Sequence, residues 1–350
     1  MIEQNTSRTE LAELGEFGLI EHLTRNIILK NESTITGVGD DAAVIKAGDK
    51  HLLISTDLLT EGVHFDLTYT PLKHLGYKAA VVNFSDIAAM NGLPKQITVG
   101  ISPSNRFSVE ALEELYSGIY MACDKYGVDL IGGDTTSSAG NLFIAITVIG
   151  EAEFEDITYR NTAKSNDLIC VSGDLGGAYM GLLLLEREKQ AFIADPNMQP
   201  ELEGYDYILE RQLKPEARID IVKSLKALGI RPTSMIDISD GLASEIKHIC
   251  KNSKLGCQIY EEKIPIDITT ISMAEEFKMD PTIAALSGGE DYELLFTIKQ
   301  ADYDKIKSLS GISVIGHMTE LNEGEYLISR SGTAVELKAQ GWDAMKKNED

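Results

Sequence analysis

The sequence is poor in cysteine, in tryptophan and in positive charge. Four of its 350 residues are cysteines, and no two of them form a CxxC pair. This spacing excludes a disulfide framework and a cysteine-based zinc site, so we expect reduced cysteines in the core. Lysine and arginine together number 32 against 55 aspartates and glutamates, which gives a formal net charge of -23. A surface this acidic repels phosphate backbones, so we do not expect nucleic acid as a partner.

Long apolar runs are also missing. No segment comes near the roughly 20 apolar residues that a membrane-spanning helix needs. The stretch from Met1 to Leu14 carries three glutamates and no apolar run, so no signal peptide is visible. These absences predict a cytoplasmic protein with no membrane partner. Hydrophobic residues nevertheless make up 43% of the chain, and 350 residues are enough for two domains that each bury a core.

The residues that are present alternate between strand-like and helix-like patterns. Apolar residues at helical spacing predict a helix from Phe17 to Ile27 and another that begins at the cap Ser108. Thr70 before Pro71, with Gly92 and Pro94 at the other end, predicts a helix over 72–91. The pattern turns polar over 151–167 and then resumes, so we place a domain boundary near Asn161. The other expected elements are strands at 51–56, 96–101, 142–149 and 168–171, a helix through 185, a helix from 207, a strand ending at 238, a helix at 242–250, and strands at 257–260, 292–298 and 313–315.

One stretch between these elements has no regular pattern. Residues 186–203 are polar and contain Pro196 and Pro200. Because proline interrupts helices and strands, we predict a surface excursion here. The sequence indicates no function for it.

The positions of the aspartates are the most informative feature of the chain. Four groups lie beside glycines or at the expected ends of apolar strands: Gly39-Asp40-Asp41, Ser55-Thr56-Asp57, Gly132-Gly133-Asp134 and Asp237-Ile238-Ser239-Asp240. Strand ends are where sites form in α/β proteins. Asp86 differs, because it lies inside the expected helix 72–91 among apolar neighbours, where a carboxylate needs a partner or a metal. Any one of these aspartates could be a turn or cap residue, but five groups together predict a site.

The chemistry of these groups favours a hard cation. Oxygen ligands without histidine or cysteine suit Mg²⁺, which takes one or two carboxylates per ion together with water and substrate phosphates. Several Mg²⁺ ions that bridge phosphates would account for so many aspartates. Calcium is the competing interpretation, but the spacing does not match the EF-hand loop. The chain has neither a Walker A loop nor the ordered protein-kinase motifs, so a kinase of this sequence belongs to neither large class.

Read in order, these motifs resemble those of the thiamine-monophosphate kinase family over nearly the whole chain. The matching segments are 37–42, 55–57, 62–65, 83–90, 130–136, 237–242 and 287–294. The aspartate motifs alone indicate only the wider superfamily that resembles aminoimidazole ribonucleotide synthetase, selenophosphate synthetase and a hydrogenase maturation protein. His64 and the segment from Gly288 to Leu294 make the resemblance specific. The single tryptophan, Trp342, matches an aromatic position that the family uses against its substrate.

The resemblance implies a fold, an activity and a set of site residues. The fold would be α/β (α+β), of the two-domain aminoimidazole-ribonucleotide-synthetase type, with residues 1–160 binding ATP and Mg²⁺ and pairing in a homodimer, and residues 161–350 as the carboxy-terminal domain. The activity would be Mg²⁺-dependent in-line transfer of the ATP γ-phosphoryl group to thiamine monophosphate, giving thiamine diphosphate and ADP. The metal ligands carry over to Asp40, Ser55, Thr56, Asp57, Asp86, Asp134, Asp237 and Asp240. Catalytic roles fall to Asp57, Asp86, Asp134 and Asp240, ATP contacts to Gly133, Asp134, Arg160 and Ser239, and substrate contacts to His64, Glu290 and Trp342.

The implied acceptor explains the scarcity of acid–base groups. A phosphate monoester has a second pKa of about 6, so at neutral pH the acceptor is largely a dianion and needs no strong general base. The difficulty lies in bringing two anions together, which favours a site rich in bound cations. The thiazolium ring of the substrate would attract the indole of Trp342 by about 0.5 to 2 kcal/mol.

Two alternatives stay open at this level. Another enzyme of the superfamily is the nearest, although selenophosphate synthetase needs a reactive cysteine near the amino terminus and no cysteine precedes Cys123. A non-catalytic metal-binding or nucleotide-sensing protein with the same fold is the second. The intact Asp57, Asp86, Asp134 and Asp240 argue against it.

Overall fold

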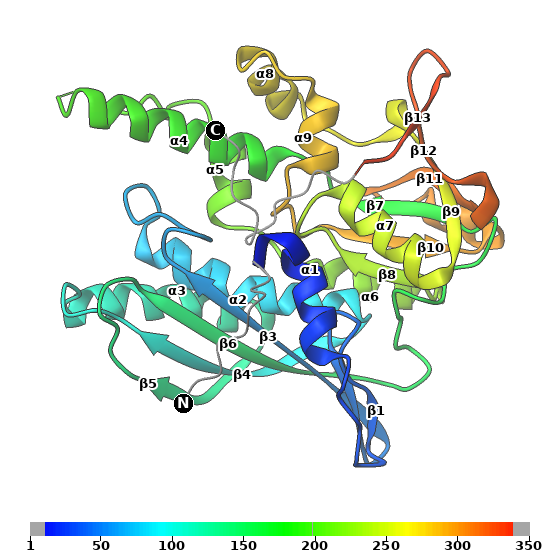
Figure 1. Ribbon diagram of the computed structural model, residues 1–350, viewed down its shortest axis with the longest axis horizontal. Helices are drawn as coiled ribbons and strands as arrows, with labels where there is room; N and C mark the ends of the chain where they lie inside the picture. Colours follow the sequence, from blue (N-terminus) through cyan, green and yellow to red (C-terminus); the bar gives the residue numbers. More distant parts are fainter. Residues whose placement is uncertain (1–10, 198, 339–350) are drawn as a thin grey trace, which may run out of the picture.

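Two sheets organise the chain in the computed structural model, which describes residues 11–197 and 199–338 (Figure 1). The first sheet has six strands in the order β1-β2-β3-β6-β4-β5, and the second has seven in the order β13-β12-β9-β11-β7-β10-β8. The β4–β5 and β12–β9 pairs are parallel, and the other described neighbours are antiparallel. Residues 153–167 connect the two sheets, and the boundary that we place near Asn161 lies in this segment.

The first sheet is covered by helices on one face. Its strands are β1 Thr34–Thr36, β2 Ala43–Ala47, β3 Lys50–Thr60, β4 Leu93–Ser102, β5 Asp129–Thr135 and β6 Phe143–Ala152. Alternate side chains such as Ile97, Val99 and Ile146 are buried under helices α2 (Leu72–Ala89) and α3 (Val109–Tyr126). The predicted cap of α3 is confirmed, because Ser108 Oγ accepts a hydrogen bond from Ala111 N at 3.3 Å.

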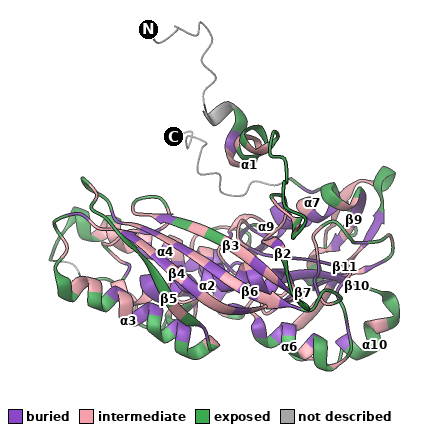
Figure 2. Cartoon of the chain, turned by 90° about the horizontal axis from the view of Figure 1, so that it is seen from below, coloured by how far each residue is buried: buried purple, intermediate pink, exposed green. Residues whose placement is uncertain are grey.

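No helix of the described residues covers the opposite face of the first sheet, which is partly open (Figure 2). Thr56 on β3 is exposed, Thr98 on β4 and Thr147 on β6 are half-buried, and Leu58 keeps 58% of its surface accessible. A row of small polar and apolar side chains on an uncovered sheet face is a feature of surfaces that pair with another molecule.

Helix α2 lies between the two halves of the molecule. Every residue from Leu75 to Ala89 is buried except Asp86, which is half-buried. On one side α2 packs so closely on α3 that a Cβ on Gly76 would lie 1.9 Å from Leu115 O. On another side it contacts β8 of the second sheet and helices α5 and α6. Because the helix is buried almost all round, apolar residues occur on every side of it and its sequence carries no simple amphipathic stripe, while Lys78, Asn83 and Ser85 are buried as well.

The second sheet carries most of the remaining helices. Its strands are β7 Leu168–Ser172, β8 Ser234–Asp237, β9 Leu255–Tyr260, β10 Leu294–Ile298, β11 Ile312–Glu320, β12 Glu325–Ile328 and β13 Ala334–Glu336. The helices are α4 Gly177–Ala194, α5 Asp206–Leu213, α6 Ile219–Ala227, α7 Leu242–Ser253, α8 Ile268–Glu276, α9 Pro281–Ser287 and α10 Tyr303–Ile306. All four cysteines are buried and free, as predicted.

Two expectations about helices need correction. The surface excursion predicted for 186–203 is half helical, because α4 continues to Ala194 and projects beyond the second sheet (Figure 1). Its polar residues have partners on the first domain, since Lys189 Nζ lies 2.8 Å from Asp66 Oδ2 and Tyr69 Oη donates to Glu186 at 2.7 Å. Helix α1 (Leu11–Thr24) ends before Ile27, which is exposed outside it.

One strand of the first sheet is not revealed by local sequence patterns. Strand β5 contains Gly132, Gly133 and two aspartates, residue types that are rare in strands. The strand lies so close to β4 that a Cβ on Gly133 would be 1.8 Å from Val99 O, so the close pairing of the two strands requires glycine at this position. Among the described residues, no helix has both the length and the apolar character to cross a membrane. A cytoplasmic location stays a prediction from the sequence.

Candidate active site

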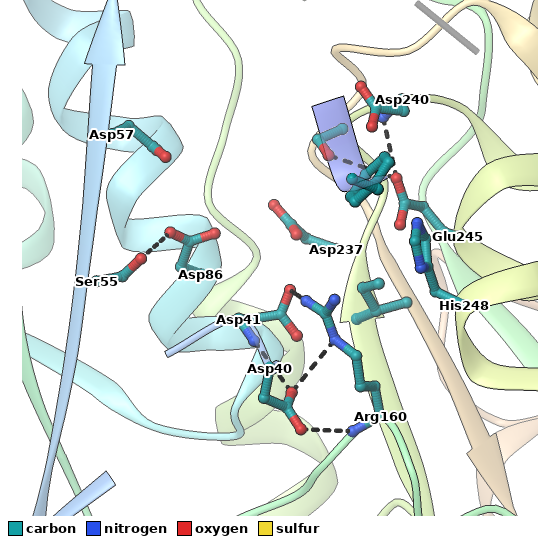
Figure 3. A pocket seen from close by; sticks show the side chains of 13 residues that line it. Asp40, Asp41, Ser55, Asp57, Asp86, Arg160, Asp237, Asp240, Glu245 and His248 are labelled. Carbon is teal, nitrogen blue, oxygen red and sulfur yellow. Dashed lines mark hydrogen bonds and ion pairs between the residues drawn. The ribbon is translucent and has the colours of Figure 1, made fainter. Parts of the chain in front are cut away.

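A cavity of about 220 Å³ opens where the two sheets meet (Figure 3). The predicted site residues that line it are Asp40, Ser55, Asp57, Asp86, Arg160, Asp237, Ser239 and Asp240. They come from the loop before β2, from β3, from α2, from the segment between the sheets and from the end of β8. Residues that are scattered along the sequence therefore converge on one hollow, although β3 extends to Thr60 and places Asp57 inside the strand rather than at its end.

One turn of α2 ties these groups together. Asn83 Oδ1 accepts a hydrogen bond from the backbone N–H of Asp57 at 3.1 Å. Ser85 Oγ donates to Asp237 Oδ2 at 2.6 Å, and Ser55 Oγ donates to Asp86 Oδ2 at 2.5 Å. The side chains of this helical turn therefore position β3 of the first domain and β8 of the second relative to each other.

Three carboxylates form the centre of the cavity. Asp41, Asp86 and Asp237 each bring an oxygen to within 4.8 Å of the others. Burial and the charges of Asp57 and Asp237 raise the pKa of Asp86 well above its ordinary range, and burial with the charge of Asp41 raises the pKa of Asp237 to about 7. Asp41 Oδ2 is buried without a hydrogen-bond partner among the described residues. A divalent cation is the group that such a cluster accommodates.

Asp41 was not among the predicted metal ligands, which included only the first aspartate of the Gly39-Asp40-Asp41 motif. The two carboxylates have different surroundings. Asp40 accepts backbone hydrogen bonds from Asp41 N at 3.0 Å and Arg160 N at 3.2 Å. Burial and the neighbouring charge of Asp41 raise the pKa of Asp40 to about 7. The doublet in the sequence was the available signal, but it does not tell which member faces the cluster.

Arg160 supplies the positive charge of the cavity. Its Nη2 lies 2.5 Å from Asp41 Oδ1, and its Nε lies 3.4 Å from Asp40 Oδ1. Burial alone would lower the pKa of this guanidinium, but the two aspartates outweigh it and keep the group charged. The residue predicted to contact ATP therefore neutralises part of the carboxylate cluster.

Replacing Arg160 with methionine is expected to lower the melting temperature of the cation-free protein by several degrees. Removing one partner of a buried ion pair leaves the other charges uncompensated, at a cost of about 3 to 5 kcal/mol. Adding MgCl₂ should recover much of the loss, which scanning fluorimetry with and without the salt would measure. Arg106→Met is the control, because the Arg106–Glu61 pair has a half-exposed arginine and should contribute little. An unchanged melting temperature for Arg160→Met would contradict this interpretation.

Two further polar residues of the cavity, Glu245 and His248, were not predicted from the sequence. Glu245 on α7 accepts hydrogen bonds from Asp240 N at 3.1 Å and Ser239 Oγ at 3.4 Å, and burial raises its pKa well above the ordinary range. His248, one helical turn later, has its ring centroid 4.5 Å from that of Phe17 on α1. Burial, with the charge of Arg160, lowers the pKa of His248 to about 4, so the imidazole is neutral at physiological pH. The spacing of Glu245 and His248 after Asp240 was the only signal in the sequence.

Other predicted residues lie outside this cavity. Thr56 points to the opposite face of β3 from Ser55 and Asp57, and its Oγ1 donates to Ile146 O at 3.1 Å. Gly133 and Asp134 are exposed on β5, at the edge of the first sheet. Trp342 lies outside the described residues.

The two remaining predicted substrate residues lie in one neighbourhood. His64 Nδ1 accepts a hydrogen bond from Thr60 N at 3.0 Å. Burial lowers the pKa of His64, and the negative charge of Glu290 opposes this shift. Glu290 belongs to the second domain, so the two side chains interact across the interface between the domains. Tyr292 joins this neighbourhood to the carboxylate cluster, because burial and the charges of Glu290, Asp57 and Asp237 raise its pKa well above the ordinary range.

Comparison with known proteins supports the resemblance. Residues 39–152 match the family model described as AIR synthase related protein, N-terminal domain. The thiamine-monophosphate kinase of Bacillus subtilis is 33% identical over 341 residues, which cover 95% of this chain and 100% of the relative. The Escherichia coli K12 enzyme of the same name is 34% identical, with 94% of this chain and 98% of the relative covered.

Solved structures agree in fold. A structure described as AaThiL complexed with AMPPCP and TMP matches with a TM-score of 0.82 and 32% identity, and 96% of this chain and 99% of that chain are covered. The hydrogenase maturation protein HypE in complex with ATP, at 18% identity and a TM-score of 0.67, shares the fold. The predicted two-domain architecture of the aminoimidazole-ribonucleotide-synthetase type is confirmed, and the chain belongs to the thiamine-monophosphate kinase family.

Proposed function

We propose that this protein transfers the γ-phosphoryl group of ATP to thiamine monophosphate and releases thiamine diphosphate and ADP. The observation that carries the proposal is the buried group of carboxylates between the domains, in a chain that matches kinases of this specificity over nearly its whole length. A similar protein binds an ATP analogue and TMP together, as the description of that complex states. ATP-dependent phosphorylation of a phosphate acceptor is the reaction that fits both.

Several Mg²⁺ ions belong to this proposal. Asp41, Asp86 and Asp237 fit a divalent cation, because their oxygens converge, they are hard ligands, and one oxygen of Asp41 is buried with no hydrogen-bond partner in the part of the chain that the structure describes. The neighbouring Asp40, Ser55, Asp57 and Asp240 line the same cavity and would complete the ligand set. Bound Mg²⁺ neutralises the phosphates and the charge that develops during transfer.

The residues of the chain would then bind and align the two substrates. Arg160 and Ser239 line the cavity wall and would contact the nucleotide. His64, which the charge of Glu290 affects, would contact the acceptor together with Glu290. The neutral His248 donates no charge to the site, and a dianionic acceptor requires no general base. Catalysis by alignment and charge neutralisation is the mechanism that such a set of residues supports.

We also propose a homodimer that pairs the uncovered faces of the first sheet. Thr147 on β6 lies between Thr56 on β3 and Thr98 on β4. Gly100, two residues after Thr98 on β4, lies opposite Asp134 on β5. Thr56 and Asp134 therefore project from the same open face. Two strands separate them, so at about 4.8 Å per strand they are roughly 14 Å apart and cannot bind one ion within a single chain. A second copy on this face would bring the Asp134 of one chain toward β3 of the other, the strand that carries Ser55 and Asp57.

The reaction itself can be tested with purified protein, ATP, MgCl₂ and thiamine monophosphate. We expect thiamine diphosphate and ADP in equal amounts, separated and quantified by chromatography. Excess EDTA should abolish both products, because the carboxylate cluster then lacks its cations. ADP without thiamine diphosphate, or no turnover at all, would overturn the proposal.

A further inference from the structure

A buried lysine connects the two domains beside the predicted acceptor site. Lys78 lies on α2 with only 6% of its side chain exposed. Its Nζ donates to Glu290 Oε2 at 2.9 Å and to the backbone oxygen of Gln212 at 3.0 Å. Lys78 belongs to the first domain, and its partners Glu290 and Gln212 belong to the second. Lysine is almost never buried unless its charge is paired, so these two contacts hold the Lys78 ammonium group in place.

Two donors hold the same oxygen of the Glu290 carboxylate. Gln212 Nε2 donates to the same oxygen, Oε2, at 2.7 Å, so Lys78 and Gln212 both occupy one end of the carboxylate. In the part of the chain that the structure describes, the second oxygen, Oε1, accepts no hydrogen bond. The carboxylate is therefore oriented, and one of its oxygens is available to a ligand.

The backbone around Glu290 shows that this orientation is enforced. Glu290 has φ +59° and Tyr292 has φ +51°, values that residues other than glycine seldom adopt. Hydrogen bonds from Glu290 N to Ser239 O at 2.7 Å and from Tyr292 N to Ile238 O at 2.9 Å hold the segment against the end of β8. Asp291, between them, accepts from Gly176 N at 2.7 Å on the other side. Backbone strain of this kind gathers at functional sites, where surrounding contacts maintain it.

We infer that Lys78 is a positioning residue for the acceptor: together with Gln212 it fixes the Glu290 carboxylate and neutralises it. The inference rests on the proposed function. Glu290 has its backbone N–H bonded to Ser239 O, next to the carboxylate cluster, so an unpaired Glu290 would add a further negative charge there and would repel an approaching phosphate dianion. Paired with Lys78, the carboxylate can accept a hydrogen bond from the substrate without that repulsion.

The structure offers a matched control for a purely structural ion pair. Lys125 on α3 pairs with Glu216 of the second domain, so this contact also joins the domains. It lines a different cavity, together with Arg218 and Glu293, and none of the predicted site residues takes part in it. Both side chains are half-exposed, so loss of the Lys125–Glu216 pair should change the melting temperature little and should leave substrate binding unchanged.

The test compares steady-state constants and melting temperatures of Lys78→Met, Gln212→Leu and Lys125→Met. We expect Lys78→Met to raise the KM for thiamine monophosphate by about ten- to a hundredfold, because a charge-assisted bond to Glu290 is lost. Gln212→Leu should raise it by about three- to tenfold, since a neutral donor is lost. The KM for ATP should stay within about twofold in both variants. Combining Lys78→Met with Glu290→Gln should add little to the larger single effect, because the residues act through one carboxylate.

The outcomes separate the inference from its alternatives. Unchanged KM for thiamine monophosphate in an active Lys78→Met protein would overturn the inference while leaving the proposed function intact. An equal rise in both KM values, together with a melting temperature well below that of Lys125→Met, would show a structural role and overturn it too. If Lys78→Met does not fold, Gln212→Leu decides in the same way. Failure of the unaltered protein to make thiamine diphosphate would instead overturn the proposed function.

Discussion

Replacing Asp86 with asparagine is expected to lower kcat by about a thousandfold or more while the protein stays folded. Asp86 is at the centre of the carboxylate group, with oxygens of Asp41 and Asp237 within 4.8 Å. A cation held there supplies several kcal/mol of charge stabilisation, and each 1.36 kcal/mol that is lost costs about tenfold in rate. Asparagine keeps the shape and can still accept the bond from Ser55 Oγ, but it offers no charge to a metal.

The stability of this variant should move in the opposite direction from its activity. Burial and like charges raise the pKa of Asp86 in the folded protein, so ionising it at neutral pH costs more there than in the unfolded chain. A neutral asparagine removes that cost, and the melting temperature without Mg²⁺ should rise or stay the same. The stabilisation that MgCl₂ gives the unaltered protein should shrink in the variant.

Asp49→Asn is the matched control, because Asp49 is an exposed aspartate in the turn between β2 and β3. Its turnover and its response to MgCl₂ should equal those of the unaltered protein. Turnover at the unaltered rate in Asp86→Asn would remove this carboxylate from the site. A large drop in melting temperature would show that Asp86 serves the fold.

Co-expression of two inactive variants should restore about a quarter of the normal activity, if the proposed dimer shares residues between its sites. One variant is Asp86→Asn, which affects the cavity of its own chain. The other is Asp134→Asn, on the exposed edge strand β5. Random pairing makes about half of the dimers mixed, and each mixed dimer would contain one site with both aspartates intact.

Each variant expressed alone is the control and should be inactive. Chains that complete their own sites would give no activity in the mixed dimers, since every site would then lack one aspartate. That result would contradict the sharing of Asp134 between chains. Sedimentation analysis of Thr98→Glu, which places a charge on the open face of the first sheet, would test the dimer independently of activity.

Local patterns explain which parts of the fold could be predicted. The helix over 72–91 and the strands around it follow from apolar spacing and from glycine and proline at their ends. Elements such as β5 could not be predicted, because Gly132 and Gly133 form a strand only where β4 requires a backbone without side chains. Helix α4 continues past its apolar part because its polar residues find partners on the first domain.

The amino-acid sequence by itself determined the family and the preference for a hard cation, because the order of the motifs and the type of ligand atoms can be read without knowing how far apart the residues lie in space. The tertiary structure alone decided which of these residues meet. It turned Ser55 and Asp57 toward the cavity and Thr56 away from it, brought in Asp41 and Glu245, and placed Lys78 against Glu290. The physical reason is the packing of α2 between two sheets. Segments that lie far apart in the chain pack on the different sides of this buried helix, and this packing sets the distances between them. A local sequence pattern carries no information about these distances.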